Sequence, residues 1–288
     1  MSGRDELIAS YYTLAGAPVG QPPRFPFEER VAAAAEAGFV GVGLLADDYA
    51  AMRAAGTSDA ELRRVLDDHG IAVLEVEFHY DWAEDGDRGR QASEREATLL
   101  AMADVFAPDH VNVGDLNAPG SGPPAALVTE RFGQLCDRAA EHGIRVAFEF
   151  LPWSAFPDLR SAWDVVRRAA RPNGGVLVDA WHYFRGTPDP QLLRSIPPEH
   201  LVGVQLDDAD PQPVGPLFED TMFRRRLPGD GAFDLTGLVR ALDETGVDVP
   251  YSVEIMSTTE QARPVRDAAA RAYRAARSVL SHARSAPR

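Results

Sequence analysis

Four polar side chains each close an apolar run in the second half of the chain. They are Glu149 in RVAFEFLPW, Asp179 in GVLVDAWHYF, Gln205 in LVGVQLDDAD and Glu254 in VPYSVEIMS. Any one alone could be a surface cap, but four in successive runs indicate a shared site. Three carboxylates and an amide oxygen at one point would repel one another and lose hydration unless a cation lay between them. This all-oxygen set predicts one divalent cation, Mn²⁺ or Mg²⁺, and disfavours zinc because it contains no His or Cys.

The elements that must position these residues follow from an alternation of short apolar runs with longer helical segments, which predicts parallel strands joined by helices. Candidate strands begin near Leu7, Phe39, Ile71, His110, Ile144, Gly175, Leu201 and Pro250. Eight strands, each followed by a helix, predict an α/β fold: a single (β/α)8 TIM barrel, whose site lies at the C-terminal ends of the strands. We expect one domain over residues 1–288, with a frayed tail after about residue 283.

Helix ends support the same arrangement. Four predicted helices stop at a glycine directly before the next strand, as left-handed C-terminal caps do: Gly38, Gly70, Gly143 and Gly246. The main alternative, a doubly wound sheet, needs a Gly-rich phosphate loop after its first strand. The corresponding stretch here, LAGAPVGQPPRFP, contains too much proline for that role.

Charge and composition limit the function. The chain carries 29 basic and 44 acidic residues, a net charge of −15, so we expect no nucleic-acid partner. Every basic residue is Arg, which excludes chemistry that needs a lysine amine, such as Schiff-base aldolases and pyridoxal enzymes. The single cysteine, Cys136, is expected to lie on the buried side of a helix as a packing residue. No signal segment or membrane span is evident, so we expect a cytoplasmic protein without a membrane partner; a homo-oligomer stays open.

With these strand-end residues, the sequence resembles the xylose-isomerase-like barrels. That superfamily holds sugar-phosphate isomerases and epimerases, inosose and 3-dehydroshikimate dehydratases, and a DNA-repair endonuclease. The resemblance covers nearly the whole chain and is strongest over residues 144–257. In the family a Glu, an Asp, a His or Gln, and a Glu close the fifth to eighth strands and bind the metal, which implies that role for Glu149, Asp179, Gln205 and Glu254. Epimerases usually carry His at the third position, whereas Gln205 resembles the bacterial 3-dehydroshikimate dehydratases.

Other motifs of the resemblance add substrate-binding and catalytic candidates. A His often follows the Asp by three residues, which matches His182 in DAWH and implies a substrate or acid/base role. An Arg often precedes a PG-x-G turn, which matches Arg226 in RRLPGDG and would bind a carboxylate, phosphate or ketol oxygen. The DNA-repair branch holds three metals with more histidines, and the seven present here exclude it.

For two further residues, the sequence allows either a place in the pocket wall or a packing role. His79 closes the third apolar run in EVEFHYDW, and it either forms a wall of the pocket or packs elsewhere. Trp153, just beyond Glu149, either supplies an apolar wall or packs beneath a loop.

Three functions remain open at this stage. The first is a metal-dependent isomerase or epimerase that acts through an enediolate on a polyhydroxylated ketone or sugar phosphate, with Glu149 and Glu254 exchanging a proton. The second is a metal-dependent dehydratase of the 3-dehydroshikimate or keto-inositol type, in which His182 transfers a proton; Gln205 and the arginine cluster favour it. The third is a non-catalytic barrel subunit. For an enzyme, the partner is a small polyhydroxylated carbonyl substrate, neutral or anionic.

Overall fold

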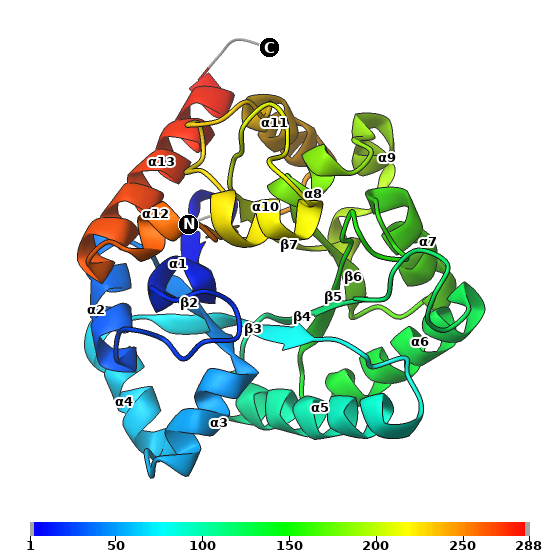
Figure 1. Cartoon of the computed structure of the whole chain (residues 1–288), viewed down its shortest axis with the longest axis horizontal. Coiled ribbons are helices and arrows are strands. Elements are labelled where there is room, and N and C mark those ends of the chain that lie inside the picture. Colours follow the sequence, from blue (N-terminus) through cyan, green and yellow to red (C-terminus); the bar gives the residue numbers. More distant parts are fainter. Residues whose placement is uncertain (1–2, 286–288) are drawn as a thin grey trace.

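Parallel strands close into one barrel in the computed structural model, which describes residues 3–285 (Figure 1). The strands are β1 (Leu7–Ala9), β2 (Gly41–Leu45), β3 (Ala72–His79), β4 (His110–Gly114), β5 (Arg145–Glu149), β6 (Gly174–Asp179), β7 (Leu201–Leu206) and β8 (Tyr251–Val253). Each pairs with the next in chain order, and β8 returns to β1 with Ser252 beside Ile8. The predicted (β/α)8 barrel is confirmed.

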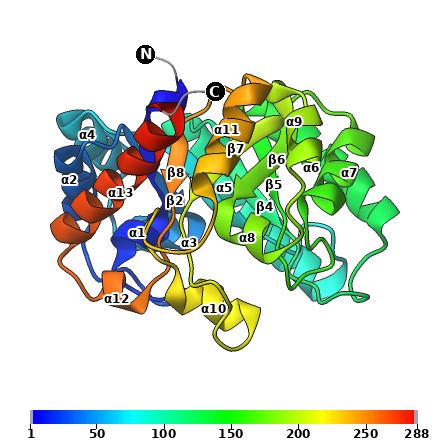
Figure 2. The same ribbon diagram turned by 90° about the horizontal axis from the view of Figure 1, so that it is seen from above.

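Helices surround the strands (Figure 1). They are α1 (Tyr11–Ala15), α2 (Phe27–Ala37), α3 (Ala46–Ala54), α4 (Asp59–His69), α5 (Gly86–Phe106), α6 (Ala125–Glu141), α7 (Leu159–Ala169), α8 (Ala180–Arg185), α9 (Pro190–Ser195), α10 (Leu217–Arg224), α11 (Leu235–Thr245), α12 (Thr258–Gln261) and α13 (Val265–Ser285), with 3-10 turns at Gly3–Asp5 and Pro198–His200. Figure 2 shows α10 and α12 at one end of the barrel. Helix α13 continues through Ser285, and the rest of the expected frayed tail lies outside the described residues.

The glycines expected to end helices adopt the left-handed conformation. Their φ angles are 105° at Gly38, 64° at Gly70, 71° at Gly143 and 82° at Gly246. A side chain at such a position costs on the order of 1 kcal/mol, so glycine lets the chain turn from each helix into the next strand. Gly38, Gly70 and Gly246 cap their helices as predicted. The cap of α6 is His142 instead, and Gly143 makes the left-handed turn one residue later.

The main hydrophobic core lies between the strands and the outer helices. Within it Phe148 of β5 stacks on Phe132 of α6, with ring centroids 5.6 Å apart, and makes an edge-to-face contact with Trp82 at 5.8 Å. Cys136 of α6 is buried, as expected for a packing residue, and burial raises the pKa of its thiol to about 12. Within residues 3–285, no helix is both long enough and apolar enough to cross a membrane.

A partly buried carboxylate joins one strand of the barrel to two outer helices. Glu96 of α5 lies 3.5 Å from Nε2 of His79 at the end of β3 and accepts hydrogen bonds from Arg138 of α6. Burial alone would raise the pKa of Glu96, but the hydrogen bonds from His79 and Arg138 outweigh it and lower the pKa to about 2. The carboxylate therefore stabilises the fold fully above pH 4.5, the ordinary pKa of the group, and this contribution is lost as the pH falls towards 2.

We predict that Glu96→Gln lowers the free energy of unfolding by about 1 to 2 kcal/mol at pH 7, a figure reduced for the partial exposure of the group. The difference from wild type should shrink as the pH falls from 4.5 to 2. Urea unfolding across that range measures both effects, with Glu94→Gln on the exposed side of the same helix as the control. Equal stability of Glu96→Gln and wild type at every pH would contradict this account.

Candidate active site and metal centre

All four predicted strand-end residues are buried at the same end of the barrel. Glu149 and Asp179 are the last residues of β5 and β6, and Gln205 pairs in register with Asp179 from β7. Glu254 follows β8 directly, and its backbone N–H donates to the carbonyl of Leu206 at 3.2 Å. Because adjacent parallel strands end together, residues distant in the sequence reach one site.

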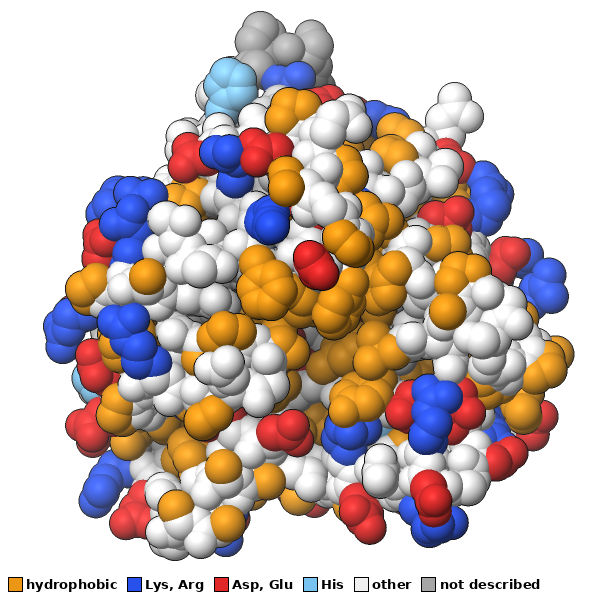
Figure 3. Space-filling view, viewed as in Figure 1, with side chains coloured by type: hydrophobic (Ala, Val, Ile, Leu, Met, Phe, Trp, Pro, Cys, Tyr) orange, Lys and Arg blue, Asp and Glu red, His pale blue; other side chains and the backbone are white. Residues whose placement is uncertain are grey.

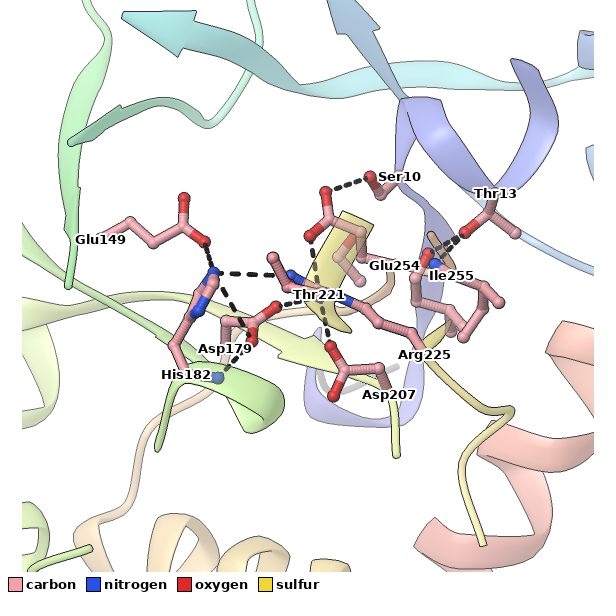
Figure 4. Close-up of polar contacts among 12 residues, drawn as sticks. Ser10, Thr13, Glu149, Asp179, His182, Asp207, Thr221, Arg225, Glu254 and Ile255 are labelled. Atoms are coloured by element: carbon pink, nitrogen blue, oxygen red, sulfur yellow. Dashed lines mark hydrogen bonds and ion pairs between the residues drawn. The ribbon is translucent and has the colours of Figure 1, made fainter. Parts of the chain in front are cut away.

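Glu149, Asp179 and His182 form a cluster that could hold a metal ion (Figure 4). Ligand atoms from all three lie within 4.8 Å of one another. His182 Nε2 is 3.1 Å from Glu149 Oε1 and 3.9 Å from Asp179 Oδ1. Asp179 also caps α8, accepting a hydrogen bond from the backbone N–H of His182 at 2.8 Å. This cap explains the three-residue spacing, because an N-cap carboxylate reaches the N–H at the third helical position.

Arg225 inserts a guanidinium group among the carboxylates (Figure 4). Its Nη1 lies 2.6 Å from Asp179 Oδ2 and 3.0 Å from Glu254 Oε2, and it also donates to Asp207. Its Nε donates to Thr221 Oγ1 at 3.1 Å, and the whole side chain is buried. The protein therefore supplies part of the positive charge that the converging carboxylates require.

The same interactions separate the pKa values of these carboxylates. Burial alone would raise the pKa of Asp179, but the charge of Arg225 outweighs it and holds that pKa below its usual value. Burial raises the pKa of Glu254 to about 7, although Arg225 opposes the rise. Burial and the charge of Asp179 raise the pKa of Asp207 well above its usual value. Glu254, which accepts a hydrogen bond from Ser10 Oγ at 3.0 Å, is thus suited to exchange a proton near neutral pH.

Arg225, rather than the predicted Arg226, is the arginine that points into the site. Arg224 and Arg226 form backbone bridges to Ser257 and Asp208, so the extended segment turns the residue between them towards the site. Arg226 instead points outward: its side chain is 46% exposed and its Nη2 lies 2.6 Å from Asp210 Oδ1. Arg225 was missed because the arginine triplet offers no signal for which member faces inward.

His79 does not form the pocket wall that was predicted as one of its roles. It is buried against Glu96 on the helical side of β3. The pairing of β3 with β4 shifts register between Val76 and His79, which breaks the alternation of side chains along the strand. Glu77 lines the cavity instead and accepts a hydrogen bond from the backbone N–H of Tyr11 at 3.3 Å.

A cavity of about 450 Å³ opens above these groups, a volume suited to a small molecule. Its polar side carries Glu149, His182, Arg225 and Glu254. Trp153 lines it as predicted, with its ring 5.3 Å from that of His182 and 5.6 Å from that of Phe218 on α10. Figure 3 shows apolar side chains gathered around a hollow near the centre of this face.

The donor set fits a divalent cation. The buried oxygens Gln205 Oε1 and Asp207 Oδ1 have no hydrogen-bond partner among the described residues. Both are therefore available to bind a cation. The presence of His182 in the cluster removes the argument against zinc, which depended on an all-oxygen set. That the oxygens of Glu149, Asp179, Gln205 and Glu254 share one cation stays a prediction.

The chain belongs to the family described as the xylose isomerase-like TIM barrel, whose model matches residues 31–279. It is 30% identical to the 3-dehydroshikimate dehydratase of Pseudomonas aeruginosa over 243 residues, which are 83% of this chain and 37% of that protein. It is 29% identical to the inosose isomerase of Bacillus velezensis over 124 residues, 42% of this chain and 43% of that protein. The chain thus spans less than half of the length of either relative, and both relatives are enzymes.

Solved structures show the same architecture. A xylose isomerase-like TIM barrel/4-hydroxyphenylpyruvate dioxygenase fusion protein matches 98% of this chain and 43% of its own, with a TM-score of 0.85 and 25% identity. The IolI protein, solved with a bound zinc atom, matches 98% of this chain and all of its own, with a TM-score of 0.85 and 18% identity. The second likeness shows the fold alone.

We predict that the purified chain binds one divalent ion and that Asp179→Asn weakens this binding by at least about tenfold. Asparagine can still cap α8, so the fold should persist while the carboxylate charge is lost. Calorimetric titration with Mn²⁺ and with Zn²⁺ measures the affinities. Asp210→Asn, at the outward ion pair with Arg226, is the matched control and should bind as wild type does. Unchanged affinity in Asp179→Asn would place the ion elsewhere.

Proposed function

We propose that this barrel is a metal-dependent dehydratase, a lyase that removes water from a polyhydroxylated cyclic ketone of the 3-dehydroshikimate type. One observation carries the proposal: His182, held 3.1 Å from Glu149, and Glu254 line the same cavity. Two separate proton-transfer groups are what an elimination needs, one to accept a proton and one to donate. The likeness to a 3-dehydroshikimate dehydratase over 83% of the chain supports the choice of reaction.

Dehydration of a β-hydroxy ketone breaks a C–H bond beside the carbonyl and a C–O bond one carbon further on. The C–H electron pair forms the new double bond, and the departing hydroxyl takes up a proton and leaves as water. Glu254, beside Ser10 and Arg225, is placed to accept the proton from carbon. His182, oriented by Glu149, is placed to donate a proton to the leaving oxygen. The apolar side chains around the cavity limit the access of bulk water.

Glu149, Asp179 and Gln205 would hold the cation, with Glu254 at its edge. When bound, a divalent ion supplies Lewis acidity that polarises a ketone carbonyl and acidifies the adjacent C–H bond. Arg225 binds the outer oxygens of Asp179 and Glu254, which orients both carboxylates without entering the reaction.

One observation still supports the isomerase or epimerase function that the sequence predicts first. The inosose isomerase of Bacillus velezensis is 29% identical, but over only 42% of this chain. Both reactions begin with the same loss of a proton beside a carbonyl, and they differ in whether a hydroxyl then departs. The fate of that hydroxyl therefore decides between them.

We expect the metal-loaded protein to convert 3-dehydroshikimate to 3,4-dihydroxybenzoate with the release of one water. Incubation in D₂O with Mn²⁺ or Zn²⁺, followed by mass spectrometry and NMR, distinguishes the reactions. Solvent deuterium entering a ketose or inosose that keeps every hydroxyl would instead establish an isomerase. An ion-loaded protein that does neither would favour the non-catalytic subunit.

We also predict that His182→Gln loses about 10²- to 10⁴-fold in kcat while it keeps its divalent ion, because a proton donor is lost but Glu149 and Asp179 remain. Metal analysis after dialysis, together with steady-state kinetics, separates the two effects. His200→Gln, at a histidine that contacts the carbonyl of Gly174 away from the cavity, is the control. Loss of the ion from His182→Gln would make this residue a ligand rather than a proton donor.

A further inference from the structure

The cavity is lined by many negative charges and few positive ones. Carboxylates reach it from several strand ends and from α3: Asp47, Asp48, Glu77, Glu149 and Glu254. Two guanidinium groups, Arg95 and Arg225, also line it. In a chain with a net charge of −15, the protein's own side chains can hold an anionic ligand only where a basic group is not already paired with carboxylates.

Arg225 does not meet this condition. Its Nη1 contacts Asp179, Asp207 and Glu254, and its side chain is fully buried. The single charge of this guanidinium group is already shared among three carboxyl groups. An anionic substrate group beside it would add repulsion rather than binding.

Arg95 is in the opposite situation. It lies on α5 with its side chain partly buried, and its guanidinium carbon is 3.7 Å from the ring centroid of Tyr80. Its Nη1 donates to the backbone carbonyl of Tyr80 at 3.2 Å. Among the described residues it has no carboxylate partner, so most of its five N–H donors are available to a ligand. The ring and the carbonyl together fix the orientation of the guanidinium plane.

Neighbouring arginines show how unusual this is. Arg88, seven residues earlier on the same helix, pairs with Asp81 at 2.6 Å and Glu84 at 3.3 Å. Arg226 pairs with Asp210 and does not line the cavity. Arg95 is therefore the cavity-lining cation that keeps its charge free of carboxylates in residues 3–285.

We propose that Arg95 forms an anion subsite that binds the carboxylate of a flat, hydroxylated ring acid. The aromatic side chains of Phe78, Tyr80 and Trp153 on the cavity wall suit the faces of a ring. A single unpaired guanidinium group in a cavity otherwise lined by carboxylates matches one negative charge better than the double charge of a phosphate, which those carboxylates would repel more strongly. The inference rests on the proposed function, since it names the substrate class of that site. With its carboxylate at Arg95, the ring would extend across the cavity towards Glu254 and His182.

A matched pair of probes isolates the carboxylate. 3,4-Dihydroxybenzoate and catechol share the ring and the vicinal diol, and they differ only in the acid group. Quenching of tryptophan fluorescence in the metal-loaded chain gives both dissociation constants, because Trp153 lines the cavity. The variants are Arg95→Met, which keeps an apolar stem beside Tyr80, and Arg95→Lys, which keeps the charge but loses the planar fork. Arg226→Met is the matched control.

Wild type and Arg226→Met should bind the acid at least about tenfold more tightly than catechol. Arg95→Met should reduce that preference to less than about threefold while its affinity for catechol stays unchanged, which shows that the cavity is intact. Arg95→Lys should fall between them. With 3-dehydroshikimate as substrate, Arg95→Met should raise KM at least about tenfold and change kcat little.

Two results would overturn the inference: no preference for the acid in wild type, or a preference that survives in Arg95→Met. In another outcome, wild type prefers the acid and Arg95→Met loses that preference, while wild type does not dehydrate 3-dehydroshikimate. In that case the anion subsite stands and the proposed function fails. If turnover is observed and the preference survives the substitution, the proposed function stands and the subsite fails.

Discussion

The contact between the Arg225 guanidinium group and the carboxylates of Asp179, Asp207 and Glu254 is the constraint on which the mouth of the barrel depends. All four side chains are buried, and isolated charges in such a place would be strongly unfavourable. Shared ion pairs allow three strand ends to keep acidic residues side by side. They also fix the orientation of Asp179, which starts α8 and thereby places His182. One arginine thus sets the geometry of the whole acidic cluster.

As a result, Arg225 and Arg95 have different roles. Arg225 already forms ion pairs with three carboxyl groups, so it is not available to bind an acidic substrate. Arg95, stacked on Tyr80 at the cavity wall, keeps its donors free for that purpose. Glu149 and Asp179 still offer oxygens beside the unpartnered oxygen of Gln205, and a divalent ion would complete the compensation of charge. An acidic protein can in this way present a site that accepts both a cation and an anionic ring.

The sequence predicted the fold and the strand-end residues because both follow from periodic patterns. Parallel strands in chain order bring their C-terminal residues together whatever the loops do. The failures lie where periodicity breaks. A register shift in β3 turns His79 outward, and backbone bridges decide that Arg225 rather than Arg226 points inward. Arg95 could not be found from its helix, since its role depends on which carboxylates lie near it after folding.

The central claim is that this acidic cluster holds a divalent cation beside Arg225, and anomalous diffraction from crystals grown with Mn²⁺ tests it most directly. The account predicts one anomalous peak at the C-terminal end of the barrel. Oxygens of Glu149 and Asp179 should lie about 2.0 to 2.6 Å from the ion, with Gln205 or Glu254 completing the set. The absence of a peak, with Arg225 as the sole cation among the carboxylates, would contradict it.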